Sequence, residues 1–288
     1  MFRLLSAVKQ IILFCYFIVF SIIRAHKFPY FDKHEGERAM IMGNGPSLKD
    51  VLQKYNEGKM NIIHDSFFVN YSPLDETFYK IKPNHYFLSD FAFIQDTPGL
   101  TERVRRMYNM LQEKVDWDLN VYLNLPKYKY SKQLIDYSHI TNPHIHFVFL
   151  NRKHCNSLAR PLRNWLYKKG WCMPVEGTVI NTAIYVAILE GYKRIELYGV
   201  EHDMFKDVMI TDDNVLVTVD RHFYGAEKKP RMRDGGGSEK LHEFLFCVYH
   251  MLHSHYLLRQ FADYMGARVI NCTPGSMIDS YERKKMES

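Results

Sequence analysis

The 288-residue sequence lacks the cysteine signals of a disulfide-bonded or zinc-binding protein. Its five cysteines are an odd number, and no two of them form a Cys-x-x-Cys pair. A domain that faces a reducing, cytoplasmic compartment is the simpler interpretation. His250, His253 and His255 share a helical segment, but their spacing does not place all three on one face, so we expect no metal site there.

A basic stripe and internal repeats are also missing. The net charge of +6 is spread along the chain, which argues against nucleic acid and fits contact with phosphates, anionic lipids or acidic glycans. Aromatic residues make up 15% of the sequence, with 20 Tyr and 19 Phe. Such rings suit sugar or base stacking as well as core packing.

One uncharged apolar run, Ile11–Ile23, stands near the N-terminus. Basic residues flank it: Arg3, Lys9, Arg24 and Lys27. As a helix it covers about 20 Å, and an extension to Leu4 approaches the ~30 Å of a bilayer core. No small-x-small cleavage site follows, which argues against a signal peptide. We expect a membrane anchor over residues 1–25, with spanning and interfacial placement both open, and a buried helix as the alternative.

Residues 26–37 are interpreted as a linker to a domain over residues 38–288. Basic residues on both flanks of the apolar run leave the orientation open, although those just before the domain favour a cytoplasmic placement. In this domain apolar runs alternate with helical periodicity. Strands are expected at 38–42, 60–63, 85–88, 120–125, 146–150, 194–198 and 267–271. Helices are expected at 47–55, 100–115, 178–190 and 238–265. The alternation predicts an α/β, Rossmann-like fold with a mostly parallel, doubly wound sheet.

A polar insertion of about 30 residues, 206–237, interrupts this alternation and is too long for an ordinary loop. A lid that orders over a bound ligand is the functional interpretation, and surface decoration is the alternative. Within it lies Arg221-His222-Phe223-Tyr224-Gly225. His222 could accept a proton from a sugar hydroxyl near neutral pH, with Tyr224 among its aromatic neighbours, although an isolated histidine is often incidental.

Ligands of parallel sheets bind at the carboxyl ends of the strands. The turn Gly43-Asn44-Gly45-Pro46-Ser47 falls there, although it is neither a Walker loop nor Gly-x-Gly-x-x-Gly. Its glycines allow close approach to an anion, and Ser47 could cap a helix whose N–H groups face a phosphate. A plain tight turn explains the motif equally well.

Two further features fall on the same edge. Thr178 begins an apolar, buried helix and could point into the crevice, or act only as an N-cap. Gly199 and Glu201 follow the strand 194–198, where carboxylates often bind ribose or sugar hydroxyls; a solvated loop is the alternative.

No metal cofactor is expected. Asp116-Trp117-Asp118 has the spacing of a metal-binding Asp-x-Asp motif, but it precedes a strand and so lies on the wrong edge. Asp212-Asp213 lies in the insertion, without a strand to fix it. A departing phosphate would be stabilised by backbone N–H groups, hydroxyls and basic residues.

The order of four motifs resembles that of the family 42 bacterial sialyltransferases and of the related Maf-type transferases of nonulosonic acids. The motifs are Met-Gly-Asn-Gly-Pro-Ser-Leu at 42–48, Gly-Tyr-Lys-Arg-Ile-Glu-Leu-Tyr-Gly-Val-Glu at 191–201, His-Phe-Tyr-Gly at 222–225 and Cys-Thr-Pro-Gly-Ser-Met at 272–277. The resemblance covers about residues 38–282, with 95–170 unmatched.

This resemblance implies one Rossmann-like domain of a GT-A-like variant with a lid, a CMP-sugar donor, no metal and inversion at the anomeric carbon. It makes His222 the general base. It places these residues around the donor: Gly43, Asn44, Gly45, Ser47, Ser89, Asp90, Thr178 and Ser276. Asp65 stands where the family usually has Asn.

Departures from the family concern the leaving phosphate. The family uses two tyrosines there; the first falls at Asp203, and only Tyr224 or Arg221 can stand for the second. Asp65 and Asp203 leave a Kdo-like acid or another nucleotide sugar open beside a sialic acid.

We therefore expect a membrane-bound, inverting glycosyltransferase that acts on a surface glycan or glycolipid in polysaccharide or lipopolysaccharide synthesis. A Mg-ATP-dependent pyrophosphokinase of the archaeal pterin type, which shares the Gly-Asn-Gly-Pro-Ser turn, is one rival. A non-catalytic nucleotide-binding scaffold is the other. A homo-oligomer stays open, and no nucleic acid partner is expected.

Overall fold

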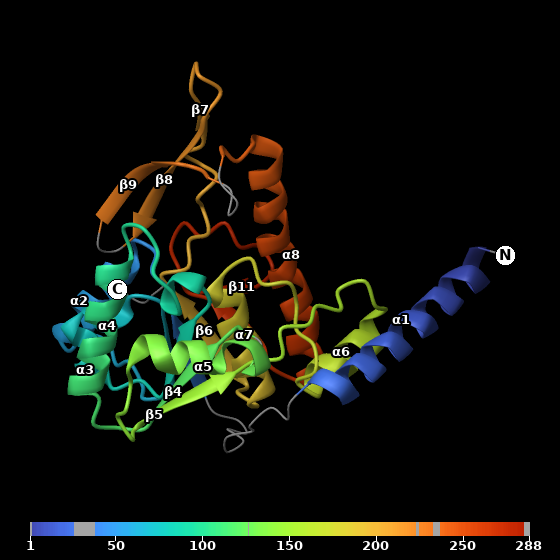
Figure 1. The fold of residues 1–288 in the computed structure, drawn as a ribbon, viewed down its shortest axis with the longest axis horizontal. Helices are drawn as coiled ribbons and strands as arrows, with labels where there is room; N and C mark the ends of the chain where they lie inside the picture. Colours follow the sequence, from blue (N-terminus) through green and yellow to red (C-terminus); the bar gives the residue numbers. More distant parts are fainter. Residues whose placement is uncertain (1, 26–37, 126, 223–224, 233–236, 285–288) are drawn as a thin grey trace.

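The computed structural model describes residues 2–25, 38–125, 127–222, 225–232 and 237–284. It is a mixed α/β structure built on an eight-stranded sheet in which all paired strands are parallel (Figure 1). The predicted Rossmann-like, doubly wound fold is confirmed. The expected linker 26–37 lies outside the described residues.

The strand order of the sheet is β11-β10-β6-β1-β2-β3-β4-β5. The strands are β1 (Arg38–Met42), β2 (Ser66–Val69), β3 (His85–Leu88), β4 (Leu119–Leu123), β5 (Ile145–Phe149), β6 (Arg194–Tyr198), β10 (Arg268–Asn271) and β11 (Glu282–Arg283). The chain adds β2 to β5 on one side of β1 and the later strands on the other. In open parallel sheets, ligands commonly bind in the crevice at such a reversal, which here falls at the carboxyl ends of β1 and β6.

Helices cover both faces of the sheet. Four pack on one face: α2 (Leu48–Asn56), α3 (Glu76–Ile81), α4 (Thr101–Lys114) and α5 (Lys127–Ser138). Three pack on the other: α6 (Arg160–Lys168), α7 (Val179–Leu189) and α8 (Leu241–Met265). Two 3₁₀ turns, η1 (Ser72–Leu74) and η2 (Phe91–Phe93), follow strand ends.

The alternation of side chains along β1 explains the two cores. Ala39 and Ile41 pack in the core that contains α7, whereas Met40 and Met42 pack in the core that contains α2. Helix α7 is apolar on all sides because every one of its residues is buried, between the sheet and α8.

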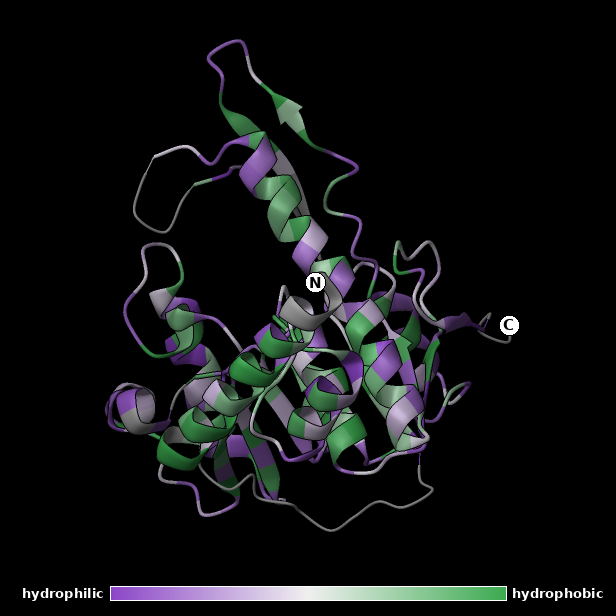
Figure 2. Ribbon diagram, turned by 90° about the vertical axis from the view of Figure 1, so that its right-hand side faces the viewer, coloured by the Kyte–Doolittle hydropathy of each residue, from purple (hydrophilic) through white to green (hydrophobic). Residues whose placement is uncertain are grey.

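The polar insertion forms a small antiparallel sheet of β7 (Met209–Ile210), β8 (Leu216–His222) and β9 (Gly225–Pro230). This sheet stands apart from the central sheet in two perpendicular views (Figure 1, Figure 2). Its base is fixed by a third cluster, in which Leu216 packs with Phe244, Val248 and Met251. The insertion is therefore a folded element attached to α8 and not a simple loop.

The second strand was predicted in the wrong place. Residues 60–63 precede the strand, and the buried run Ser66–Val69 pairs with β1 instead. Both runs are short and apolar, and Phe67 and Phe68 carry more buried surface. As a result Asp65 lies at the start of a strand, not after its end.

Helix α1 (Phe2–Arg24) contains the apolar N-terminal run. Among the described residues, it is the one helix long and apolar enough to cross a membrane, over Ser6–Ile23. Only 11% of that window is buried within the protein, which argues against the core-helix alternative. The helix lies on the opposite side of the molecule from α2, α3 and α4 (Figure 1).

Candidate functional site

The glycine-rich turn after β1 lies against the loop after β6. Gly43 N donates to Tyr198 O at 2.7 Å, and Gly45 N donates to Gly199 O at 2.8 Å. A Cβ on Gly43 would lie 2.2 Å from Gly199 O, and one on Gly45 would lie 1.5 Å from Glu201 Oε2. Gly199 itself has φ +65°, a conformation that favours glycine. The glycines therefore permit two loops of the crevice to meet.

Glu201 occupies the N-terminus of α2 with its carboxylate. Ser47 N donates to Glu201 Oε1 at 2.7 Å, while the Ser47 side chain makes no capping bond. The expectation that the Ser47 side chain caps α2 is thereby corrected, and the N–H groups of Gly43, Gly45 and Ser47 donate to Tyr198 O, Gly199 O and the Glu201 carboxylate. A protein carboxylate holds the place in which an anion was expected.

Five buried polar atoms at this edge have no hydrogen-bond partner in the described part of the chain. They are Asn44 Oδ1, Ser47 Oγ, Ser89 Oγ, Asn124 Oδ1 and Glu201 Oε2. They follow β1, β3, β4 and β6, so they share the carboxyl edge of the sheet. Buried polar groups without a partner in a native fold indicate a ligand or ordered water. Three of the five atoms can only accept, which suits the hydroxyl groups of a sugar or ribose.

Asn124 was not predicted as a site residue, because the strand was expected to continue to Leu125. Its side chain follows the end of β4 and is buried. Asp90, which was predicted, accepts a hydrogen bond from Ala92 N at 2.8 Å and caps the turn η2. Ser89 is thus the residue of this pair with an unused hydroxyl.

Asp65 does not belong to the site, because it lies on the opposite edge of the sheet. Its Oδ1 accepts a hydrogen bond from Asn84 Nδ2 at 2.6 Å, and its carbonyl accepts from Met40 N. Asn70 is the residue that directly follows β2, with φ +49°.

Ser276 reaches the crevice but its hydroxyl is already bonded. It donates to Val200 O at 2.7 Å and accepts from Asn271 Nδ2 at 2.9 Å. Next to it, Met277 N donates to Glu201 O. Ser276 thus fixes the loop after β10 against the loop after β6.

Thr178 lies at this edge, as predicted, at the N-terminus of α7. Its Oγ1 is 3.5 Å from His202 Nε2. Asn181 Oδ1 accepts hydrogen bonds from Gly177 N and Thr178 N, which caps the helix. The start of α7 therefore meets the loop after β6.

His202 and His255 form a buried network that was not predicted. His202 Nδ1 lies 3.1 Å from His255 Nε2, and His255 Nδ1 lies 3.1 Å from the Tyr281 hydroxyl. Asn181 Nδ2 donates to His255 Nε2 at 3.2 Å, because Asn181 Oδ1 already accepts from the backbone. These contacts link the start of α7, the loop after β6 and α8.

The pKa values of both imidazoles are lowered. Burial lowers the pKa of His202 to about 4, and together with His202 it lowers the pKa of His255 well below its ordinary value. His202 also has φ +50°, a strained conformation for a residue other than glycine. The one sequence signal for this histidine pair was the position of His202, directly after the strand-end carboxylate Glu201. Its partner His255 lies 53 positions away, so no local pattern connects the two.

Four residues named from the sequence fall in the insertion or beside it. His222 is the last residue of β8. The side chains of His222 and Arg221, and the whole of Tyr224, lie outside the described part of the chain. Asp203 forms an ion pair with Lys206 at 3.6 Å.

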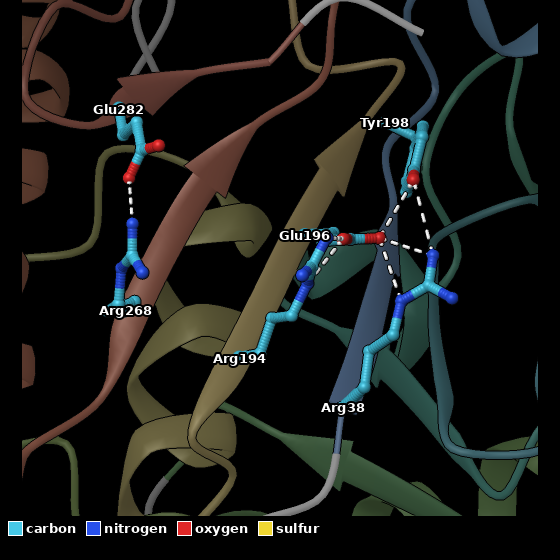
Figure 3. Close-up of polar contacts among 6 residues, drawn as sticks. All are labelled: Arg38, Arg194, Glu196, Tyr198, Arg268 and Glu282. Carbon is cyan, nitrogen blue, oxygen red and sulfur yellow. Dashed lines mark hydrogen bonds and ion pairs between the residues drawn. The ribbon is translucent and has the colours of Figure 1, made fainter. Parts of the chain in front are cut away.

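A second buried carboxylate of the same region is fully paired. Glu196, in β6, accepts from Arg38 Nε at 2.8 Å, from Arg194 Nε at 2.7 Å and from the Tyr198 hydroxyl at 2.8 Å (Figure 3). Burial raises the pKa of this carboxyl, but the bonds to Arg194, Arg38 and Tyr198 outweigh burial and leave the pKa below its ordinary value. The group lines a basic cavity of about 470 Å³ on the sheet.

No group of three or more His, Cys, Asp or Glu side chains that could hold a metal occurs within the described ranges. Comparison with protein-family models finds no match for the chain, and comparison with curated proteins finds none either. The unpartnered polar atoms at the carboxyl ends of the strands are therefore the best indication of a ligand-binding site.

Proposed function

We propose that the protein is an inverting, metal-independent glycosyltransferase. It binds a nucleotide-activated sugar, with a CMP-activated acid of the sialic or Kdo type favoured, in the crevice at the carboxyl ends of β1 and β6. It transfers this sugar to a hydroxyl of a surface glycan or lipid-linked acceptor. The observation that carries the proposal is the set of unpartnered polar atoms on this edge: Asn44 Oδ1, Ser47 Oγ, Ser89 Oγ, Asn124 Oδ1 and Glu201 Oε2.

Charge divides the crevice into two ends. A donor hydroxyl bonds to Glu201 Oε2, since a carboxylate attracts O–H groups and repels a phosphate. The donor phosphate lies at the start of α7, beside Thr178, where the helix dipole is positive. This assignment moves the phosphate away from the turn 43–47, whose N–H groups at Gly43, Gly45 and Ser47 are already used.

The transfer needs a base for the acceptor. The His222 imidazole takes the proton of the acceptor hydroxyl while the oxygen forms a bond to the anomeric carbon of the donor. The bond from that carbon to the phosphate oxygen breaks, its electron pair leaves with CMP, and the anomeric configuration inverts. Position 222 ends β8 in the insertion, which is attached to α8 and not to the central sheet.

Membrane association follows from α1. The helix holds the catalytic domain at the cytoplasmic face of a membrane, where a lipid-linked acceptor is available. Its apolar window, Ser6–Ile23, supports this assignment.

The test is sugar transfer by the purified full chain in detergent, with CMP-sugars as donors and EDTA present. We expect turnover in the wild type and a loss of about 1,000-fold in kcat for His222→Ala, the range of a lost general base. His144→Ala is the matched control, since this exposed histidine lies at the far edge, next to Asp118, and its turnover should equal that of the wild type.

Three outcomes would contradict the proposal. Undiminished turnover of His222→Ala would remove its role as base. A requirement for Mg²⁺ and ATP would favour the pyrophosphokinase, and CMP binding without transfer or donor hydrolysis would favour the scaffold.

A further inference from the structure

Helix α1 has two different faces. Its inner face contacts the domain and consists of residues spaced by three or four positions: Gln10, Leu13, Phe14, Phe17, Ile18 and Ser21. Its outer face has the same spacing and is exposed: Val8, Ile11, Ile12, Cys15, Val19, Ile22 and Ile23. The helix is therefore docked on the protein along one side and uncovered along the other.

The docked side makes specific contacts. Gln10 Nε2 donates to Ser157 O at 3.1 Å, and Gln10 Oε1 accepts from Ala159 N at 2.6 Å. Phe14 packs edge-on against Trp165 of α6, and Phe17 is buried. The helix thus belongs to the folded domain over at least three turns.

Lys153 adds a polar contact farther along the same helix. Its Nζ donates to the Tyr16 hydroxyl at 3.0 Å and lies 4.5 Å from the centroid of the Phe20 ring. Together with the Gln10 contacts, this places charged and backbone polar groups of the domain beside the middle of the apolar window Ser6–Ile23.

The exposed side is formed by aliphatic side chains. Six aliphatic side chains on it, Val8, Ile11, Ile12, Val19, Ile22 and Ile23, are 45 to 72% exposed. Water is a poor solvent for such a surface, and contiguous apolar patches of this kind mark contact with a protein or a membrane.

Basic groups border this side. Lys9 is exposed near one end, and Lys153 Nζ lies 3.0 Å from the hydroxyl of Tyr16, which is itself exposed. An aliphatic stripe bordered by lysines complements the acyl chains and anionic head groups of a bilayer surface.

We propose that α1 lies in the plane of the membrane interface, with its outer face among the acyl chains and the domain resting on the bilayer. A helix that crossed the membrane would carry Lys153, the Ser157 carbonyl and the Ala159 N–H into the hydrocarbon layer. Polar groups there cost several kcal/mol each unless they are fully paired. The inference rests on the proposed membrane association but not on sugar transfer.

Cys15 offers a native probe in the middle of the outer face. It and Cys247 are exposed, whereas Cys155, Cys172 and Cys272 are buried. In the Cys247→Ser full chain, a polarity-sensitive fluorophore on Cys15 should shift to the blue with phosphatidylcholine vesicles that contain phosphatidylglycerol. The label is then moved to position 8 or 22 in a Cys15→Ser background, and lipids brominated at different depths report where each label lies.

For a helix in the membrane plane, all three labels have the same shallow depth. A profile in which the label at position 15 is deepest, with 8 and 22 near opposite surfaces, would establish a spanning helix and overturn the proposal. No spectral shift at any position would overturn membrane association as well, and neither result depends on enzyme activity.

Flotation with the same vesicles gives a second measurement. Ile12→Asp should reduce the bound fraction about tenfold, because it places a charge in the acyl region without disturbing the docked face. Ile135→Asp changes an equally exposed isoleucine, of α5, on another part of the surface. It should bind as the wild type does; equal binding of all three proteins would contradict the assigned face.

Discussion

Glu196 and Glu201 are two buried carboxylates of the same segment with opposite surroundings. Glu196 has hydrogen bonds on both oxygens, from Arg38, Arg194 and Tyr198 (Figure 3). Glu201 has one oxygen on Ser47 N and a second oxygen, Oε2, with no partner in the described part of the chain. The complete pairing of Glu196 is typical of a structural group. The unused oxygen of Glu201 is typical of a group that binds a ligand.

This comparison also ranks the two sites. The cavity beside Glu196 is lined by several basic side chains. Its carboxylate, however, is already paired with Arg38 and Arg194. The crevice beside Glu201 has unused acceptors on four strand ends. We therefore assign the donor to the crevice and a stabilising role to Glu196.

Replacing each carboxylate by its amide should have the largest effect on donor binding. Glu201→Gln keeps an oxygen for Ser47 N but turns the unpartnered acceptor into a donor. We expect donor affinity, measured by calorimetry, to fall about 100-fold, since a hydrogen bond to a charged group contributes up to ~3 kcal/mol. Glu196→Gln should leave donor affinity within about twofold.

The stability of the two variants should show the reverse order. Glu196→Gln removes the charge partner of two arginines and should cost about 2 kcal/mol in chemical unfolding; the cost stays moderate because both arginines are partly exposed. A carboxyl whose pKa is lowered on folding stabilises the folded protein at pH values above its unfolded pKa of 4.5. The difference from the wild type should therefore shrink as the pH falls below 4.5. Equal losses of donor affinity in both variants would remove the distinction between the two groups.

Alanine substitutions in the glycine-rich turn test the position of the Glu201 carboxylate. Gly43→Ala brings a Cβ to 2.2 Å from a backbone oxygen, which cannot move alone, so we expect a loss of about 2 kcal/mol in stability. Gly45→Ala brings a Cβ to 1.5 Å from Glu201 Oε2, which can rotate away, and to 2.8 Å from Gly199 O, a milder backbone clash than that at Gly43. This variant should be more stable than Gly43→Ala and still lose donor affinity.

Gly58→Ala is the control for both changes. No atom lies within 4 Å of its added Cβ, so only its φ of +71° opposes the substitution. It should cost about 1 kcal/mol and leave donor affinity unchanged. Normal donor affinity in a folded Gly45→Ala protein would mean that the position of the Glu201 carboxylate is unimportant.

Sequence periodicity located most of the sheet but not its side-chain contacts. The strand 194–198 was predicted with the observed bounds, because its apolar run is framed by Lys193-Arg194 and Gly199. The second strand was misplaced, because hydrophobicity identifies apolar runs and does not decide which of two pairs with β1. Antiparallel strands within the insertion were also missed, since its charged residues obscured the alternation in β8.

The site was predictable only where a general rule applied. Glu201 and Thr178 were found because strand ends and helix starts share one edge of a parallel sheet. The bond between Glu201 and Ser47 N joins positions 154 residues apart, and no local pattern encodes it. For the same reason the turn 43–47 was expected to bind an anion from solution, although the carboxylate of Glu201 already occupies that place.

The smallest effect concerns the neutral histidine beside Glu201. A histidine whose folded pKa is about 4, below its ordinary 6.5, binds its proton only after unfolding, so the protein loses stability as the pH falls from 6.5 toward 4. From this group alone we expect a loss of about 1 kcal/mol between pH 6.5 and 5.5. In His202→Asn, which suits a φ of +50° and does not titrate, that part of the loss should vanish while the part from His255 remains. Urea unfolding at both pH values measures the difference. An identical pH dependence in variant and wild type would show that folding does not lower the pKa of His202.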